Sequence, residues 1–261
     1  MRTASAFVLA GLIAASAPSH AYRMIQDTTI GRSSSGTPVT CNASGGFAHW
    51  EIRAIPWYIN LGSQSSDKRT AIDNAMSSWY NVPYTDYNPY DSGTTTAGFT
   101  TDGQNTIDWE SNSACGSSCL AVTALVLQYG QVIVEADIAY NPTFNFYTNG
   151  SNYDTESVAA HELGHTLGIH HTNLTSTPYP TMYYAISGTG ARTLETDDMN
   201  ALQCSEDRYP VPPVCVTDPD CEQYCSDQKF QCDGGGLQDA TEQARCDNTY
   251  FECQSTCTTC S

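Results

Sequence analysis

The sequence has few basic residues and few charged residues of any kind. Charged side chains make up 15% of the 261 residues, and 10 Lys and Arg stand against 28 Asp and Glu, which gives a formal net charge of −18. Such a surface repels phosphate groups, so we expect no nucleic-acid partner and no attraction to an anionic membrane. Hydrophobic residues reach 40%, which allows a sizeable core and argues against wholesale disorder.

Long apolar runs are absent beyond the N-terminus. There, Arg2 precedes a short apolar stretch at residues 7–13, and the small-x-small triplet Ser19-His20-Ala21 follows. This order is typical of a secretory signal peptide, here residues 1–21 with cleavage after Ala21. A membrane anchor is the alternative, but the run is short for a bilayer span. We therefore expect a secreted, extracellular chain without a membrane span in its mature form.

The 12 cysteines are unevenly distributed. Four precede residue 210, and eight crowd into the C-terminal region, after a proline-rich segment. This distribution predicts one large domain at residues 22–206, a stiff linker at 207–214 and a small module at 215–261. In an exported chain so many cysteines indicate disulfides, and zinc binding by the C-terminal cysteines is the alternative.

The C-terminal module has too few aliphatic residues for a core, so disulfides should hold it together. The gaps between its inner cysteines run 4, 7, 14, 7 and 4, a palindrome broken in the middle by Asp-Gly-Gly-Gly at residues 233–236. Gaps of 4 and 7 keep side chains on one helical face. We therefore predict a disulfide-stapled α-hairpin with helices at about 219–232 and 238–257. The predicted bonds are Cys221–Cys257, Cys225–Cys253, Cys232–Cys246 and Cys215–Cys260.

Four cysteines remain for the large domain. Cys115 and Cys119 are close in sequence and can form a bridge, which leaves Cys41 to pair with Cys204. That bond would tie the N-terminal segment to the last helix. By restricting the unfolded chain it could contribute about 4–5 kcal/mol at most.

Hydrophobic periodicity predicts a mixture of helices and strands in the large domain. The expected elements are strands at 55–60, 106–109, 120–128 and 132–140, helices at 66–80, 156–168 and from 196 onward, and a loop with short strands at 81–103. The strands at 120–128 and 132–140 flank Tyr129-Gly130, which indicates a hairpin.

The residues that carry chemistry lie within one run, residues 161–171. His161 and His165 are four residues apart, so on a helix they project from one face and can share one zinc ion. Glu162 can reach a metal-bound water, which fits a general base better than a ligand.

The end of the same run offers a third ligand. Gly168 permits a left-handed turn that ends the helix, after which His171 can supply a third nitrogen. His170 is the alternative third ligand. Three histidines leave a fourth position open, as a catalytic zinc site requires.

This run resembles the extended motif H-E-x-x-H-x-x-G-x-x-H of the metzincin metalloproteases, and all five fixed positions are present. Pro-Thr-Met-Tyr-Tyr at residues 180–184 resembles the Met-turn that follows the motif. The resemblance implies that Met182 packs beneath the zinc ligands without binding the metal. An ordinary core methionine is the alternative.

Within the metzincins, residues 50–206 are most similar to the matrixins and their short bacterial relatives, and residues 194–203 resemble the matrixin segment that opens the last helix. The resemblance implies an α+β catalytic domain: a twisted, mostly parallel sheet with one antiparallel edge strand, an active-site helix, the Met-turn and a C-terminal helix. It also implies that the edge strand pairs with substrate backbone. That strand is Leu120, Ala121, Val122 and Thr123, and an ordinary sheet strand is the alternative.

Three features depart from the matrixin pattern. Residues 110–150 contain no His, where matrixins bind a structural zinc, so we expect only the one catalytic zinc. Calcium held by Asp carboxylates and backbone oxygens is compatible with the sequence, which locates no site for it. The residues around Cys41 do not match the segment whose cysteine blocks zinc in matrixin proenzymes, so a disulfide is favoured over a latency thiolate.

The third departure is Tyr184, two residues after Met182. This position resembles that of a tyrosine that approaches the zinc in the astacins and serralysins, where a phenol could stabilise a developing oxyanion. A packed aromatic residue is the alternative.

Together these features predict a zinc-dependent endopeptidase that acts on protein or peptide substrates with Glu162 as general base. A zinc hydrolase of a non-peptide amide is one alternative. A non-catalytic binding protein on a protease scaffold is the other, and the intact Glu162 argues against it.

Overall fold

A computed structural model of the chain describes residues 21–27, 31–33, 36–109, 119–175 and 177–209. The predicted signal peptide before Ala21, the predicted bridging residue Cys115 and the predicted C-terminal disulfide ladder lie outside these residues. Within the described part of the chain, no helix is long and apolar enough to cross a membrane.

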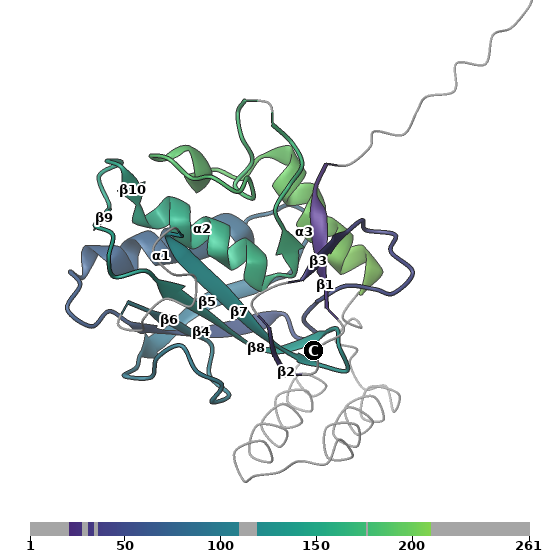
Figure 1. Cartoon of the computed structure of the whole chain (residues 1–261), viewed down its shortest axis with the longest axis horizontal. Helices are drawn as coiled ribbons and strands as arrows, with labels where there is room; N and C mark the ends of the chain where they lie inside the picture. The colour runs from purple at the N-terminus through teal and green to yellow at the C-terminus, as the bar shows by residue number, and fades with distance from the viewer. Residues whose placement is uncertain (1–20, 28–30, 34–35, 110–118, 176, 210–261) are drawn as a thin grey trace, which may run out of the picture.

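A six-stranded sheet forms the centre of the fold (Figure 1). Its strands are β2 (Gly31–Ser33), β4 (Ala54–Asn60), β5 (Asn88–Thr94), β6 (Thr106–Asp108), β7 (Ala121–Gln128) and β8 (Val132–Tyr140). They lie in the order β2-β7-β8-β6-β4-β5. The pairs among β8, β6, β4 and β5 are parallel, whereas β7 is antiparallel to β8 and β2 is antiparallel to β7.

Three α-helices accompany this sheet in the described residues: α1 (Asp67–Tyr80), α2 (Thr155–Thr166) and α3 (Thr196–Arg208), with a short 3-10 helix η1 (Gly190–Arg192) before α3. Helices α1 and α2 lie next to each other on the sheet (Figure 1). The buried Trp79 of α1 joins them, because its indole Nε1 donates to Ala160 O at 2.8 Å. The apolar face predicted for this helix, Ile72 to Trp79, is buried.

The N-terminal segment forms a second, smaller sheet with the chain that leaves α2. In it, β1 (Arg23–Gln26) lies between β3 (Thr37–Val39) and β11 (Ile169–His170), antiparallel to both. Two further short strands, β9 (Phe146–Tyr147) and β10 (Tyr153–Asp154), pair in parallel ahead of α2.

The N-terminal segment is also linked covalently to α3. Cys41 and Cys204 form a disulfide with a Cα–Cα distance of 6.1 Å, the pairing reached by elimination from the sequence. Cys41 therefore has no thiol to offer as a latency ligand. Cys119 is also disulfide-bonded, and its predicted partner Cys115 lies outside the described residues.

The predicted α+β class is confirmed, with a mostly parallel sheet and an antiparallel strand, β7, beside it. The structure adds one feature that periodicity did not predict. The three-residue strand β2 lies outside β7 and pairs with Leu125 to Leu127, which follow the residues predicted to bind substrate.

Candidate metal centre

Helix α2 carries the first two histidines, and its start is held by Asp154. The Asp154 carboxylate caps the helix by accepting from Ser157 N at 3.0 Å, and it forms an ion pair with Arg192. Most of α2 is buried, His161 and Glu162 included. Because the helix is regular, residues 161 and 165 face the same way.

Gly168 turns the chain back toward the helix. Its φ is +81°, a left-handed conformation that favours glycine. A Cβ at this position would also lie 1.9 Å from Ala48 O, so no larger residue fits. The chain then continues as β11, paired with β1, and brings His171 back to His161 and His165.

The three imidazoles converge on one point. His171 Nε2 lies 3.2 Å from both His161 Nε2 and His165 Nε2. At a Zn–N distance of about 2.0–2.1 Å, two corners of a tetrahedron are about 3.3–3.4 Å apart. The nitrogens are therefore spaced as zinc ligands. Within the described residues, these three form the one group of metal-binding side chains, and His170 is not part of it.

Backbone carbonyls orient two of the rings. His161 Nδ1 lies 2.7 Å from Thr181 O, and His165 Nδ1 lies 2.7 Å from Ile169 O. Nδ1 must be the protonated nitrogen to donate to a carbonyl, so Nε2 keeps its lone pair for a metal.

The three imidazoles are kept neutral by their surroundings. Burial, with the neighbouring imidazoles, lowers the pKa of His161 and of His171 to about 4 and lowers the pKa of His165 as well. Neutral imidazole is the form that binds metal. The site therefore fits zinc by its donor atoms, its spacing and its protonation.

Glu162 lies beside these ligands and faces β7. Thr123 Oγ1 of β7 donates to Glu162 Oε2 at 2.7 Å. Burial raises the pKa of the Glu162 carboxyl to about 7, against the opposing effect of this hydrogen bond. Thr123 was predicted only as part of the substrate strand. The sequence carried no signal for its contact with the carboxylate.

Met182 packs against α2 at Gly164. It is buried, and its Sδ lies so close to Gly164 that a Cβ there would be 2.2 Å away. The turn is fixed by Asp198 of α3, whose carboxylate accepts from Thr181 N and Met182 N at 2.8 and 3.0 Å. Asp198 belongs to the matrixin-like segment at residues 194–203. Its place in that segment was the one indication in the sequence that Asp198 has a structural role.

Tyr184 lies apart from this packed region. Its side chain is 67% exposed, and its ring lies against that of Tyr183, 4.6 Å between centroids. Tyr183 also stacks on the exposed Tyr179, with 4.4 Å between ring centroids, so the three rings form one aromatic cluster. A role of Tyr184 in stabilising an oxyanion stays a prediction.

The N-terminal segment reaches the third ligand through Asp197. Thr172, next to His171, donates from Oγ1 to Asp197 Oδ2 at 2.6 Å, and Tyr22 N donates to Asp197 Oδ1 at 3.0 Å. Asp197 therefore links Tyr22, at the N-terminal end of the described residues, to the residue that follows His171.

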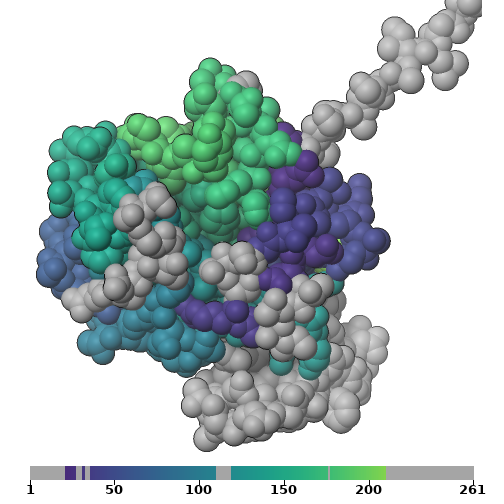
Figure 2. Space-filling model, in the orientation of Figure 1, coloured from purple at the N-terminus to yellow at the C-terminus, as the bar shows by residue number. Residues whose placement is uncertain are grey.

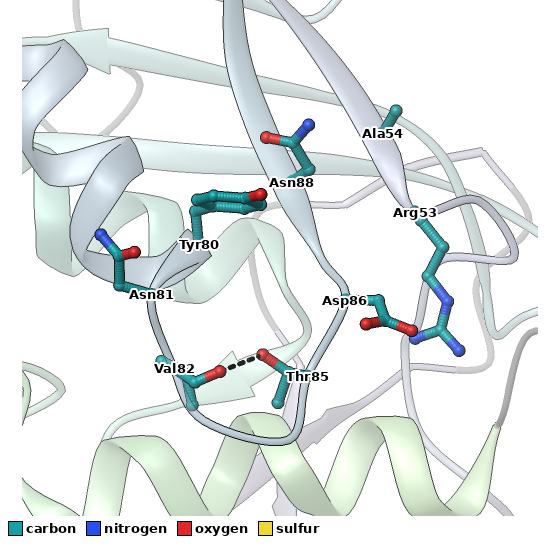
Figure 3. Close-up of a pocket in the computed structure, with 8 residues that line it drawn as sticks. All are labelled: Arg53, Ala54, Tyr80, Asn81, Val82, Thr85, Asp86 and Asn88. Atoms are coloured by element: carbon teal, nitrogen blue, oxygen red, sulfur yellow. Dashed lines mark hydrogen bonds between the residues drawn. The ribbon is translucent and has the colours of Figure 1, made fainter.

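An open pocket of about 530 Å³ lies elsewhere, between the end of α1 and the strands β4 and β5 (Figure 3). None of the three histidines lines it. Arg53 at its wall is already paired with Glu206, and Thr85 donates to Val82 O at 2.9 Å. This pocket is separate from the candidate centre.

Comparison with known proteins agrees with the geometry. The family described as Matrixin matches residues 49–205, more than half of the chain. A search of curated proteins finds no match. The match covers α2, the three histidines, the Met-turn and most of α3, and it confirms the metzincin resemblance. The chain therefore belongs to the matrixin family and is a zinc metalloendopeptidase, a hydrolase of peptide bonds.

Proposed function

We propose that Glu162 is the general base of this endopeptidase and that the chain acts on proteins or peptides outside the cell. The observation that supports the catalytic role is the position of the Glu162 carboxylate. It directly follows the ligand His161 on α2, and Thr123 Oγ1 holds its Oε2 at 2.7 Å. One carboxylate oxygen is oriented by this bond, and Oε1 is available to exchange a proton.

Zinc held by His161, His165 and His171 would supply a Lewis acid that polarises the scissile carbonyl and makes water more acidic. Glu162 takes a proton from the attacking water, whose oxygen bonds to the carbonyl carbon. Glu162 then gives that proton to the amide nitrogen as the C–N bond breaks. The carboxylate is regenerated, and the products are one carboxylate and one amine.

The strand β7 is the proposed binding edge for the substrate backbone. Val122, Thr123 and Ala124 pair with β8 on one side. On the other side, the described part of the chain places no strand against them. An extended peptide can add a strand here, beside Glu162, by main-chain hydrogen bonds.

Replacing the base should separate zinc binding from catalysis. Glu162→Gln keeps all three ligands, so bound zinc should stay near one per chain. Turnover of denatured protein should fall about 10²–10⁴-fold, because proton transfer is lost. Metal content and cleavage rate are measured on the same preparation.

Two controls give this experiment its meaning. A chelator should abolish cleavage by the unaltered chain, and a small non-peptide amide should not be hydrolysed in place of protein. Near-normal turnover by zinc-loaded Glu162→Gln would exclude Glu162 as the base, and failure of the unaltered chain to cleave any peptide would exclude the proposed activity.

Secretion is proposed from the signal-like residues 1–21. The hydrogen bond from Tyr22 N to Asp197 is compatible with cleavage after Ala21, because a free amino group also donates. Sequencing the first residues of the exported protein should therefore give Tyr22. A chain that keeps residues 1–21 after export would contradict the proposed cleavage.

A further inference from the structure

The strand β2 occupies part of the edge along which a substrate would bind. It pairs with β7 in antiparallel register, with Gly31 opposite Leu127, Arg32 opposite Val126 and Ser33 opposite Leu125. In Figure 1 it lies at the end of β7 that is farther from α2, and Figure 2 shows purple atoms of the N-terminal segment at the surface of this face.

The direction of β2 matches that of an extended peptide bound antiparallel to β7. β2 enters opposite Leu127 and leaves opposite Leu125, so it runs toward Thr123 and Glu162. An antiparallel peptide on this edge would point the same way, with its amino end toward Leu127. The positions opposite Leu125 to Leu127 are therefore already filled on the amino side of the cleavage point.

An ion pair between the partly exposed Arg32 and buried carboxylates holds β2 in place. Arg32 Nη1 lies 2.7 Å from Asp137 Oδ2 and 3.9 Å from Glu135 Oε1, and both carboxylates on β8 are fully buried. The Arg32 guanidinium also lies 4.2 Å from the centre of the Phe99 ring. Removing Arg32 would leave two buried carboxylates without this cation, which is strongly unfavourable. This anchoring opposes displacement of β2 by a substrate.

We propose that β2 sets the amino-side end of the substrate groove, so that a peptide pairs with β7 only as far as Ala124. Residues farther toward the amino end of the substrate then gain no ladder contact. This inference rests on the proposed function, because it assumes that β7 binds a peptide substrate.

Peptides of increasing length test the proposal. The sequence around the cleaved bond is kept, and residues are added one at a time on its amino side. With the unaltered chain, kcat/KM should rise by about 1.4- to 5-fold for each residue that pairs, and then become constant. With Arg32→Ala, β2 is released and kcat/KM should keep rising over further residues.

Arg69→Ala is the matched control. Arg69 forms an ion pair with Asp91 on β5, at the opposite edge of the sheet, and its side chain is 24% exposed against 26% for Arg32. This variant should reach the same constant kcat/KM at the same peptide length as the unaltered chain. Arg32→Gln, which keeps hydrogen-bond donors, replaces Arg32→Ala if the latter does not fold.

Hydrogen exchange on the zinc-free protein gives a readout that does not depend on activity. Successive amides of a strand point to opposite sides, so the readout is limited to those amides of residues 31–33 and 125–127 that bond between β2 and β7. They should stay protected when the longest peptide is added, and should lose protection in the Arg32 variant alone. Loss of protection on adding peptide, or the same length dependence in all variants, would overturn the proposal. If no peptide of any length is cleaved by the zinc-loaded unaltered chain, the proposed function fails instead, and the exchange data still test β2.

Discussion

At the scale of single residues, Gly164 has a steric role that the zinc-binding motif at residues 161–171 does not specify. It is one of the two unspecified positions between His161 and His165. A Cβ there would lie 2.2 Å from Met182 Sδ and 2.8 Å from Trp79 Cζ2. Carbon atoms in ordinary contact are about 3.5–4.0 Å apart. Only glycine lets α2 and Met182 approach so closely.

Gly164→Ala should therefore destabilise the fold. Overpacking of this kind costs about 1–3 kcal/mol, more than the about 1 kcal/mol that alanine gains over glycine in a helix. Denaturant titration of the zinc-free protein measures the change in free energy of unfolding. Gly190→Ala is the control, since a Cβ at Gly190 meets nothing within 4 Å. An unchanged midpoint for Gly164→Ala would show that Met182 moves away without cost.

The ligand set could be predicted because its spacing is local. His161, His165, Gly168 and His171 are constrained by one helix and one turn. The groups that support them come from distant positions. Thr123 is 39 residues from Glu162 in sequence, and no local pattern connects a strand hydroxyl with a helix carboxylate.

At the scale of elements, the start of α2 depends on a charge from another segment. Asp154 caps the helix, and Arg192 of η1 pairs with it. Burial raises the pKa of Asp154, but the hydrogen bonds and charge of Arg192 and the bond from Ser157 N outweigh it, so the pKa lies below its usual value. The ionised carboxylate therefore stabilises the folded state. This contribution is complete at pH values above the unfolded-state pKa of about 3.9.

Asp154→Asn should remove this contribution and keep the cap, because asparagine also caps helices well. At pH 7 the variant should be about 1–3 kcal/mol less stable. The difference should disappear as the pH falls through the lowered pKa of Asp154, since the native carboxyl is then protonated. Unfolding curves at several pH values measure this difference in the free energy of unfolding.

Asp91→Asn, at the more exposed pair with Arg69, is the control and should lower the free energy of unfolding by less than about 1 kcal/mol. A difference between Asp154→Asn and the unaltered chain that persists in acid would contradict the assignment.

Most of the longer elements were predictable, although the seven-residue β5 was expected only as part of a loop with short strands at 81–103, and most of the short elements other than β6 were not. Strands β4, β7 and β8 and helix α1 lie within one residue of their predicted bounds, because each is long enough to show a period. β1, β2, β3 and β11 have two to four residues each. These short strands form because they pair with strands that are distant in sequence, and hydrophobic periodicity does not predict such pairing.

At the scale of the whole molecule, the N-terminal segment joins parts of the chain that lie far apart in sequence. β1 pairs with β11 after the zinc-binding helix, β2 pairs with β7, and Cys41 is bonded to Cys204 on α3. Cysteine counting could predict the disulfide. The two strand pairings follow from the fold alone.

The family match begins at residue 49, but the folding unit begins earlier. A chain shortened to start there would lose the carbonyl of Ala48 that lies against Gly168 and would leave Cys204 without its disulfide partner. It would also expose unpaired backbone N–H and C=O groups along β7 and β11, and such exposed strand edges pair with other chains. The boundary of homology is thus a poor place to cut this protein, because the cut would expose strand edges that are now paired and so favour aggregation.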